Sequence, residues 1–214
     1  MSVTNKPKIE AYIGASGSGK GVSITRRLAE LNPPRLLIWD PRNEYSKAAQ
    51  RYEKLSSLVG AFKRAGAGTI KARLVPGSTV DLAAAFGLVC DLAFTAGDLV
   101  LLAEELSDVT TATHAPAAWR RCVTQGRHRS LHVIGAAQRP ALIDKTFLGN
   151  CTYLRCFTLR YDDDRRTMAK ALDVPQAQID CLQTDDTARG VHIRFMERDF
   201  RAGFVQAGSI RLTH

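Results

Sequence analysis

A glycine-rich stretch near the N-terminus, GASGSGKG (residues 14–21), has the residue types and spacing of a phosphate-binding loop. Its glycines lack side chains, so the backbone can turn tightly and direct its N–H groups at an anion. A helix that follows would point its positive end at the same place, and Lys20 could reach the β- and γ-phosphates of a nucleotide. The expected phosphate-binding residues are Gly14, Ala15, Ser16, Gly17, Ser18, Gly19, Lys20, Gly21 and Val22.

Gly21 departs from the usual pattern of this loop. The residue after the lysine is normally Ser or Thr, whose hydroxyl binds Mg²⁺. Water could take that place, because Mg²⁺ commonly keeps several water ligands. Ser23 is a poor substitute, since two residues turn the helix by about 200°. Nucleotide monophosphate kinases also carry Gly-Lys-Gly, so the departure does not by itself imply an inactive protein.

Two further segments end in polar residues that suit nucleotide hydrolysis. In DLVLLAEEL, four apolar residues lead into Glu104 and Glu105. One carboxylate could hold Mg²⁺ through water, and the other could orient an attacking water. In HVIGAAQRP, Gln138 follows an apolar run and could sense a γ-phosphate or polarise water. Solvated polar residues at the ends of strands are the simpler alternative for each.

A cationic segment, WRRCVTQGRHR, lies between the acidic and the glutamine segments. One of its arginines could reach the nucleotide of a neighbouring subunit as an arginine finger, and others could bind DNA phosphates. Arg127 is the leading finger candidate and Arg129 the second. A solvated basic helix face is the alternative.

The elements that must position these residues alternate along the chain. Apolar runs predict strands at residues 8–14, 35–40, 70–76, 98–106, 131–140, 153–160 and 190–196, with an edge hairpin at 199–208. Helices are predicted at residues 19–32, 56–66, 78–97, 115–129, 162–172 and 174–182, with a loop and a helix within 41–52. This order predicts an α/β fold of the P-loop NTPase (RecA-like) type, with a mostly parallel sheet and helices on both faces. Asp40 would end the second strand near the ligand edge, or simply start a turn before Pro41.

Composition narrows the class of protein. The chain has 214 residues, which suits one domain over residues 1–214, and its net charge of +9 favours a polyanionic partner such as nucleic acid. The five cysteines show no Cys-x-x-Cys spacing, so reduced and mostly buried thiols are expected. His128 and His132 are four apart, but a strand should begin between them, so a shared metal is not expected. No signal peptide and no membrane-spanning helix are expected either.

Taken together, GASGSGK, IWDPRNEY, VLLAEEL and GRHRSLHVIGAAQRP resemble the FtsK–HerA group of DNA-pumping ATPases in their order. The resemblance spans roughly residues 8–160, and the size is similar to the packaging ATPases of membrane-containing icosahedral phages. It implies a homo-oligomeric, hexameric ring that hydrolyses ATP with Mg²⁺ and moves double-stranded DNA. It also implies a host-cytoplasmic or virion-associated location and docking to capsid vertex or portal proteins.

Carried over by motif, the resemblance implies that Lys20 binds phosphates and that Glu104 takes the metal role through water. Glu105 would be the catalytic base and Gln138 the sensor. Two departures touch the metal: Gly21 for Ser/Thr, and Glu104 for the usual Asp.

Three other functions stay open. A filamentous-phage assembly ATPase of the zonula-occludens-toxin type also uses a P-loop, but usually carries a transmembrane helix. A nucleotide kinase would fit Gly-Lys-Gly, yet no arginine-rich lid or monophosphate-binding motif is evident. A nucleotide-gated binding protein that no longer hydrolyses ATP would fit the altered metal residues.

Overall fold

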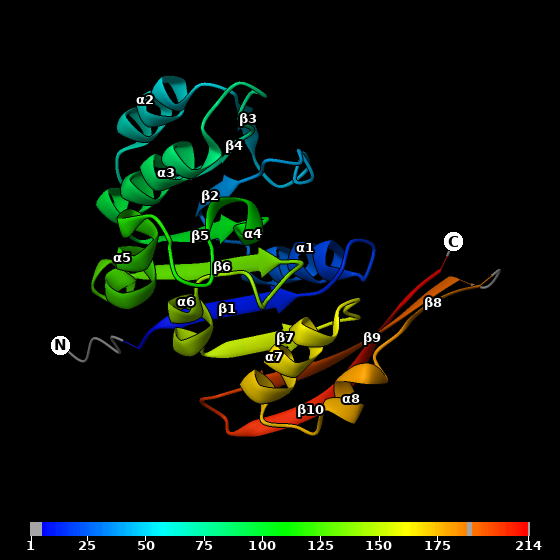
Figure 1. Ribbon diagram of the computed structural model, residues 1–214. Helices are drawn as coiled ribbons and strands as arrows, with labels where there is room; N and C mark the ends of the chain where they lie inside the picture. Colours follow the sequence, from blue (N-terminus) through cyan, green and yellow to red (C-terminus); the bar gives the residue numbers. More distant parts are fainter. Residues whose placement is uncertain (1–5, 188–189, 214) are drawn as a thin grey trace.

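The described strands of this protein form one central sheet. The computed structural model describes residues 6–187 and 190–213 (Figure 1), and within them ten strands form one sheet. Its order is β10-β9-β7-β1-β6-β5-β2-β4-β3, with β8 paired to β9 beside this path. The strands are β1 (Lys8–Ile13), β2 (Arg35–Trp39), β3 (Gln50–Tyr52), β4 (Ile70–Leu74), β5 (Leu99–Ala103), β6 (Leu131–Ala137), β7 (Tyr153–Cys156), β8 (Thr184–Thr187), β9 (Gly190–Asp199) and β10 (Phe204–Leu212).

The strands from β3 to β7 in this order pair in parallel, which confirms the mostly parallel sheet, although β3 itself was not predicted as a strand. Every residue of β2, β5 and β6 is buried, which is typical of strands covered on both faces. Only beyond β7 does the pairing among the described strands turn antiparallel, where β9 pairs with β7, β8 and β10. The carboxyl ends of β1, β6, β5 and β2 therefore meet at one edge of the sheet.

Helices cover both faces of the sheet, which confirms the predicted α/β fold. α1 lies on one face of the sheet, where its buried side chains pack against residues of β2, β5 and β6 (Figure 1). The core on the other face contains side chains from α2, α3, α5, α6 and α7. The helical segments are α1 (Lys20–Leu31), α2 (Leu55–Ala65), α3 (Leu82–Ala96), α4 (Leu106–Val109), α5 (Ala117–Gln125), the 3₁₀ helix η1 (Gly126–Arg129), α6 (Lys145–Asn150), α7 (Asp162–Leu172) and α8 (Gln176–Asp180).

The predicted helix within residues 41–52 is wrong. The chain runs through turns over residues 41–49 and then forms β3, which pairs with β4. The Asp40 carboxylate accepts the backbone N–H groups of Glu44 and Tyr45, and Arg73 donates to the Ala49 carbonyl at 3.1 Å. These side chains take backbone groups that a helix would need, so tertiary contacts override the helical pattern.

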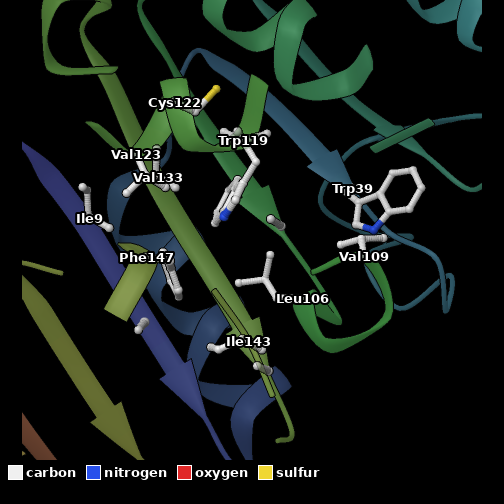
Figure 2. Close-up of a cluster of buried hydrophobic side chains, with 14 of the residues drawn as sticks. Ile9, Trp39, Leu106, Val109, Trp119, Cys122, Val123, Val133, Ile143 and Phe147 are labelled. Atoms are coloured by element: carbon white, nitrogen blue, oxygen red, sulfur yellow. The ribbon is translucent and has the colours of Figure 1, made fainter. Parts of the chain in front are cut away.

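Aromatic side chains fill the core between the sheet and its larger group of helices. Phe86 is fully buried between Trp39 and Trp119, with ring centroids 5.5 and 5.4 Å away. Trp119 in turn contacts Phe147 at 5.3 Å, and Figure 2 shows the two rings beside β6. Such tilted pairs add to the stabilisation from apolar burial. The cysteines are free thiols, and four of the five are buried, as expected.

A polar network lies on the opposite face, beside α1. Glu10 of β1 is 5% exposed and accepts hydrogen bonds from Arg27 at 2.7 Å and from Tyr12 at 2.9 Å. Its carboxylate also lies 2.8 Å from the His132 ring. Burial works against the charge, but the bonds and charges of His132 and Arg27 lower the pKa of Glu10 to about 2.

Removing Phe86 tests the aromatic core. Phe86→Ala should lower the free energy of unfolding by about 3–5 kcal/mol, because it leaves a cavity between two tryptophans. Phe204→Ala, at a side chain that is 38% exposed, serves as the matched control. It should change the free energy by no more than about 0.5 kcal/mol. Equal losses in urea unfolding of the two variants would contradict this account of the core.

The Glu10 network predicts a pH dependence of stability. Its folded-state pKa is lowered, so the stabilisation is complete above the ordinary value of 4.5 and is lost as pH falls towards 2. Glu10→Gln should cost about 3 kcal/mol at pH 7, and the difference from wild type should shrink to roughly 1 kcal/mol at pH 3. Glu53→Gln, on an exposed side chain, is the control. Denaturant unfolding at both pH values measures the difference, and a pH-independent difference would count against the network.

Candidate nucleotide-binding site

The glycine-rich loop lies between β1 and α1, as its sequence predicted. The backbone N–H of Gly14 donates to Ala137 at the end of β6, and that of Ala15 donates to Thr158 after β7. Gly19 is the N-cap of α1, and no side chain in the described part of the chain caps this N-terminus. The first N–H groups of this twelve-residue helix are therefore available to an anion. The hydroxyl of Ser18 is also buried without a hydrogen-bond partner among the described residues.

Two glycines of the loop have backbone angles that disfavour side chains. Gly17 has φ 75° and Gly19 has φ 95°, both in the left-handed region. A Cβ on Gly19 would also lie 2.6 Å from Ile193 of β9, whereas one on Gly17 would meet nothing within 4 Å. Ile193 of β9 thus packs closely against the glycine-rich loop at Gly19. The sequence did not reveal this contact.

The side of α1 at Gly21 faces the loop after β2. A Cβ on Gly21 would lie 3.9 Å from the Oε2 atom of Glu44, which is ordinary van der Waals contact. Ser23 is not available as a substitute, as expected, because it is buried and accepts a 2.6 Å hydrogen bond from Arg155. Sequence reasoning missed Glu44, although it stands four residues after Asp40 in the segment that carried the family resemblance.

Glu104 is held at the end of β5 in a nearly dry environment. It is 4% exposed and accepts a short hydrogen bond from the Tyr45 hydroxyl. Burial raises its pKa to about 7, while the positive charge of Lys20 and the Tyr45 bond oppose the rise. The charges of Glu44 and Glu105 add to it. Glu104 therefore interacts electrostatically with Lys20, Glu44 and Glu105.

Glu105 and Gln138 come together at the ends of neighbouring strands. Gln138 Nε2 donates to Glu105 Oε1 at 2.6 Å. Glu105 is 7% exposed and has φ 51° at the N-terminus of α4, so the chain turns sharply there. A carboxylate and an amide at this edge could together hold and polarise a water molecule.

Asp40 fixes the turn after β2 that carries Glu44 and Tyr45. It is fully buried, and Arg73 donates to it at 2.8 Å while the backbone N–H groups of Glu44 and Tyr45 donate at 2.8 and 3.1 Å. Its carboxylate is thus occupied in fixing the turn. Of the two interpretations of Asp40, the geometry fits the turn-forming one.

Arg127 and Arg129 lie away from the loop of their own chain. Both belong to η1, which precedes β6, whereas the glycine-rich loop follows the parallel strand β1. They therefore lie at the opposite edge of the sheet. Arg129 donates to the carbonyls of Phe94 and Thr95 at 2.9 and 2.6 Å, next to the C-terminus of α3. Within one chain the structure does not bring either arginine to the nucleotide edge.

The chain is 30% identical over 202 residues to Protein P9 of Pseudoalteromonas phage PM2, covering 86% of this chain and 88% of the phage protein. This chain belongs to the family of that phage protein. No family model matches it.

Solved structures of other proteins have the same α/β fold. The genome packaging NTPase B204 of Sulfolobus turreted icosahedral virus 2, in complex with sulfate, superposes with a TM-score of 0.73 at 16% identity, over 99% of this chain and 100% of that one. VirB4 of Thermoanaerobacter pseudethanolicus superposes with a TM-score of 0.57 at 11% identity, over 100% of this chain and 91% of that one. B204 has also been solved with ATP-γ-S. At these identities the likeness establishes the fold.

No helix within residues 6–187 and 190–213 has the length and apolarity needed to cross a bilayer.

The two left-handed glycines give a matched test of the loop. Gly17→Ala should cost about 1–2 kcal/mol of stability from backbone strain. Gly19→Ala should cost clearly more, because its Cβ also collides with Ile193. Ile193→Ala should cost less stability in the Gly19→Ala background than in wild type, because it also relieves that collision. Thermal unfolding of wild type and these variants measures this, and equal losses for the two glycines would contradict the close contact with β9.

Proposed function

We propose that this protein is an ATP-hydrolysing double-stranded DNA translocase that acts as a viral genome-packaging motor. The observation that carries the proposal is the Glu105–Gln138 pair at the edge of the sheet where the glycine-rich loop lies. Membership in the family of the phage PM2 protein and the fold shared with a packaging NTPase support it.

The residues of the loop fit a nucleotide. Residues 14–22 would surround the phosphates with backbone N–H groups, and the unpartnered hydroxyl of Ser18 lies within this loop. Lys20, nine per cent exposed, would bind the β- and γ-phosphates. ATP is the expected nucleotide, in line with the ATP-γ-S complex of B204.

The donor set also fits Mg²⁺, which is usually held by one or two carboxylates with phosphate oxygens and water. Among residues 6–187 and 190–213, no three His, Cys, Asp or Glu side chains form a cluster that could hold a metal ion by themselves. Such a cluster is not needed here, because phosphate oxygens and water would supply the other ligands. Glu104 would hold the ion through water, and the ion would neutralise charge on the phosphates. Glu105 would accept a proton from the attacking water, and Gln138 would orient that water and sense the γ-phosphate.

The motor role adds an assembly and a polymer. The net charge of +9 favours DNA as partner. A homo-oligomeric ring, expected to be a hexamer, would let Arg127 or Arg129 reach the nucleotide of the next subunit, because both lie at the far edge of their own sheet. We further propose one ATPase domain over residues 1–214, action in the host cytoplasm or on the virion, and docking to capsid vertex or portal proteins.

The other functions predict different behaviour. A nucleotide kinase would turn over only with a nucleoside monophosphate. A filamentous-phage-type assembly ATPase would hydrolyse ATP without stimulation by double-stranded DNA. A nucleotide-gated binding protein would assemble with ATP and release no phosphate.

Phosphate release with and without double-stranded DNA tests the proposal. Wild type should hydrolyse ATP and accelerate with DNA. Glu105→Gln keeps an acceptor for Gln138 but removes the base, so its rate should fall at least about 100-fold while ATP binding persists. Glu53→Gln, an exposed residue away from the loop, is the control and should keep the wild-type rate. DNA-independent turnover, or an undiminished rate in Glu105→Gln, would overturn the proposed mechanism.

A further inference from the structure

Glu44 is the side chain nearest to the place that a Cβ on Gly21 would occupy, with its Oε2 atom 3.9 Å away. We propose that the Glu44 carboxylate supplies the protein oxygen ligand for Mg²⁺ that Gly21 cannot provide. This inference rests on the proposed function, since it assigns a further residue to the same nucleotide site.

The proximity of the Glu44 carboxylate to Gly21 is the first observation that supports this proposal. A Cβ built on Gly21 has Glu44 Oε2 3.9 Å away. A Ser or Thr hydroxyl is one bond beyond that Cβ, so Glu44 already holds an oxygen next to the place of the usual ligand. Lys20, the neighbour of Gly21 in the chain, is the residue expected to contact the β- and γ-phosphates that share the ion.

The backbone of Glu44 is fixed, which is the second support. The buried Asp40 carboxylate accepts its N–H at 2.8 Å, and Arg73 donates both to Asp40 and, at 2.6 Å, to Asn43. The anchor binds the main chain and leaves the carboxylate of Glu44 on the exposed side. A ligand on an anchored turn loses less freedom on binding than one on a mobile loop.

The two metal-facing acids are linked through one residue. Tyr45, which follows Glu44, donates its hydroxyl to Glu104. The turn after β2 therefore presents one carboxylate at the Gly21 side and holds the other at the end of β5. Mg²⁺ prefers oxygen ligands, and a carboxylate offers it a full charge where a hydroxyl offers a dipole. In this way one substitution, Gly21 for Ser or Thr, is compensated by a residue from a different strand end.

The inference predicts opposite effects of Glu44 with and without metal. With Mg²⁺ bound, the Glu44 carboxylate would attract the ion and so strengthen nucleotide binding. Without Mg²⁺, the same carboxylate faces the phosphates with like charge. A residue that merely shapes the pocket would have the same effect in both conditions.

Binding of the non-hydrolysable analogue AMPPCP, measured by calorimetry in Mg²⁺ and in EDTA, tests this. Glu44→Gln should weaken binding about tenfold or more in Mg²⁺, the range found when groups that support a metal are removed. In EDTA it should bind as tightly as wild type or more tightly. Glu30→Gln, an exposed acid near the other end of α1, is the matched control and should leave both affinities unchanged.

Restoring the hydroxyl supplies a second variant. Gly21→Ser has room, because its Cβ would make only van der Waals contact, and it should recover most of the Mg²⁺-dependent affinity in the Glu44→Gln background. In the wild-type background it should add little, so the double-mutant cycle would be strongly non-additive.

The outcomes separate the inference from the proposed function. Unchanged affinity of Glu44→Gln in Mg²⁺, an equal loss in EDTA, or no rescue by Gly21→Ser would each overturn the role of Glu44 while wild type still binds AMPPCP. Failure of wild type to bind AMPPCP in either condition would overturn both this inference and the proposed function.

Discussion

Parallel pairing of four strands is the constraint on which the site depends. Ile13 pairs with Ala137, Ala103 with Gly135, and Trp39 with Ala103. These registers carry the ends of β1, β6, β5 and β2 to one edge, where the polar residues that follow them must meet. The β6 strand extends two residues beyond its pairing with the end of β5. The left-handed turn at Glu105 bridges that offset and brings its carboxylate to Gln138.

A buried charge at this edge is costly, and the Asp40 carboxylate is satisfied by donors from the adjacent turn and from Arg73 of β4. Asp40 and Arg73 have side chains that are only 1% and 5% exposed. Two backbone N–H groups complete the partners of the Asp40 carboxylate. Removing one partner of such a pair typically costs about 3–5 kcal/mol, because an unpaired charge remains buried. The result of this arrangement is a rigid turn that carries Glu44 and Tyr45.

The two faces of the sheet are stabilised in different ways. The face under most of the helices has an apolar, aromatic core around Phe86 and Trp119. The face beside α1 adds the charged network of Glu10, Arg27 and His132. Both flank β1 and β6, the strands that carry the glycine-rich loop and Gln138, so the site rests on a scaffold held from both sides. Ile193 packs closely against Gly19, so the C-terminal strands also contact the glycine-rich loop.

The sequence by itself determined the elements and the chemistry at their ends. Apolar runs and glycine-rich turns are local signals, so the strand–loop–helix around Lys20, the acids after β5 and the glutamine after β6 could be recognised, along with the α/β class. Tertiary structure alone decided which of these residues meet. The turn at 41–49 replaced a predicted helix because Asp40, directly before the turn, and Arg73 of β4 bind its backbone. The folded turn sets Glu44 beside Gly21 of α1, which is remote in sequence. Parallel topology placed Arg127 at the far edge, because strand direction depends on pairing between segments that are remote in sequence.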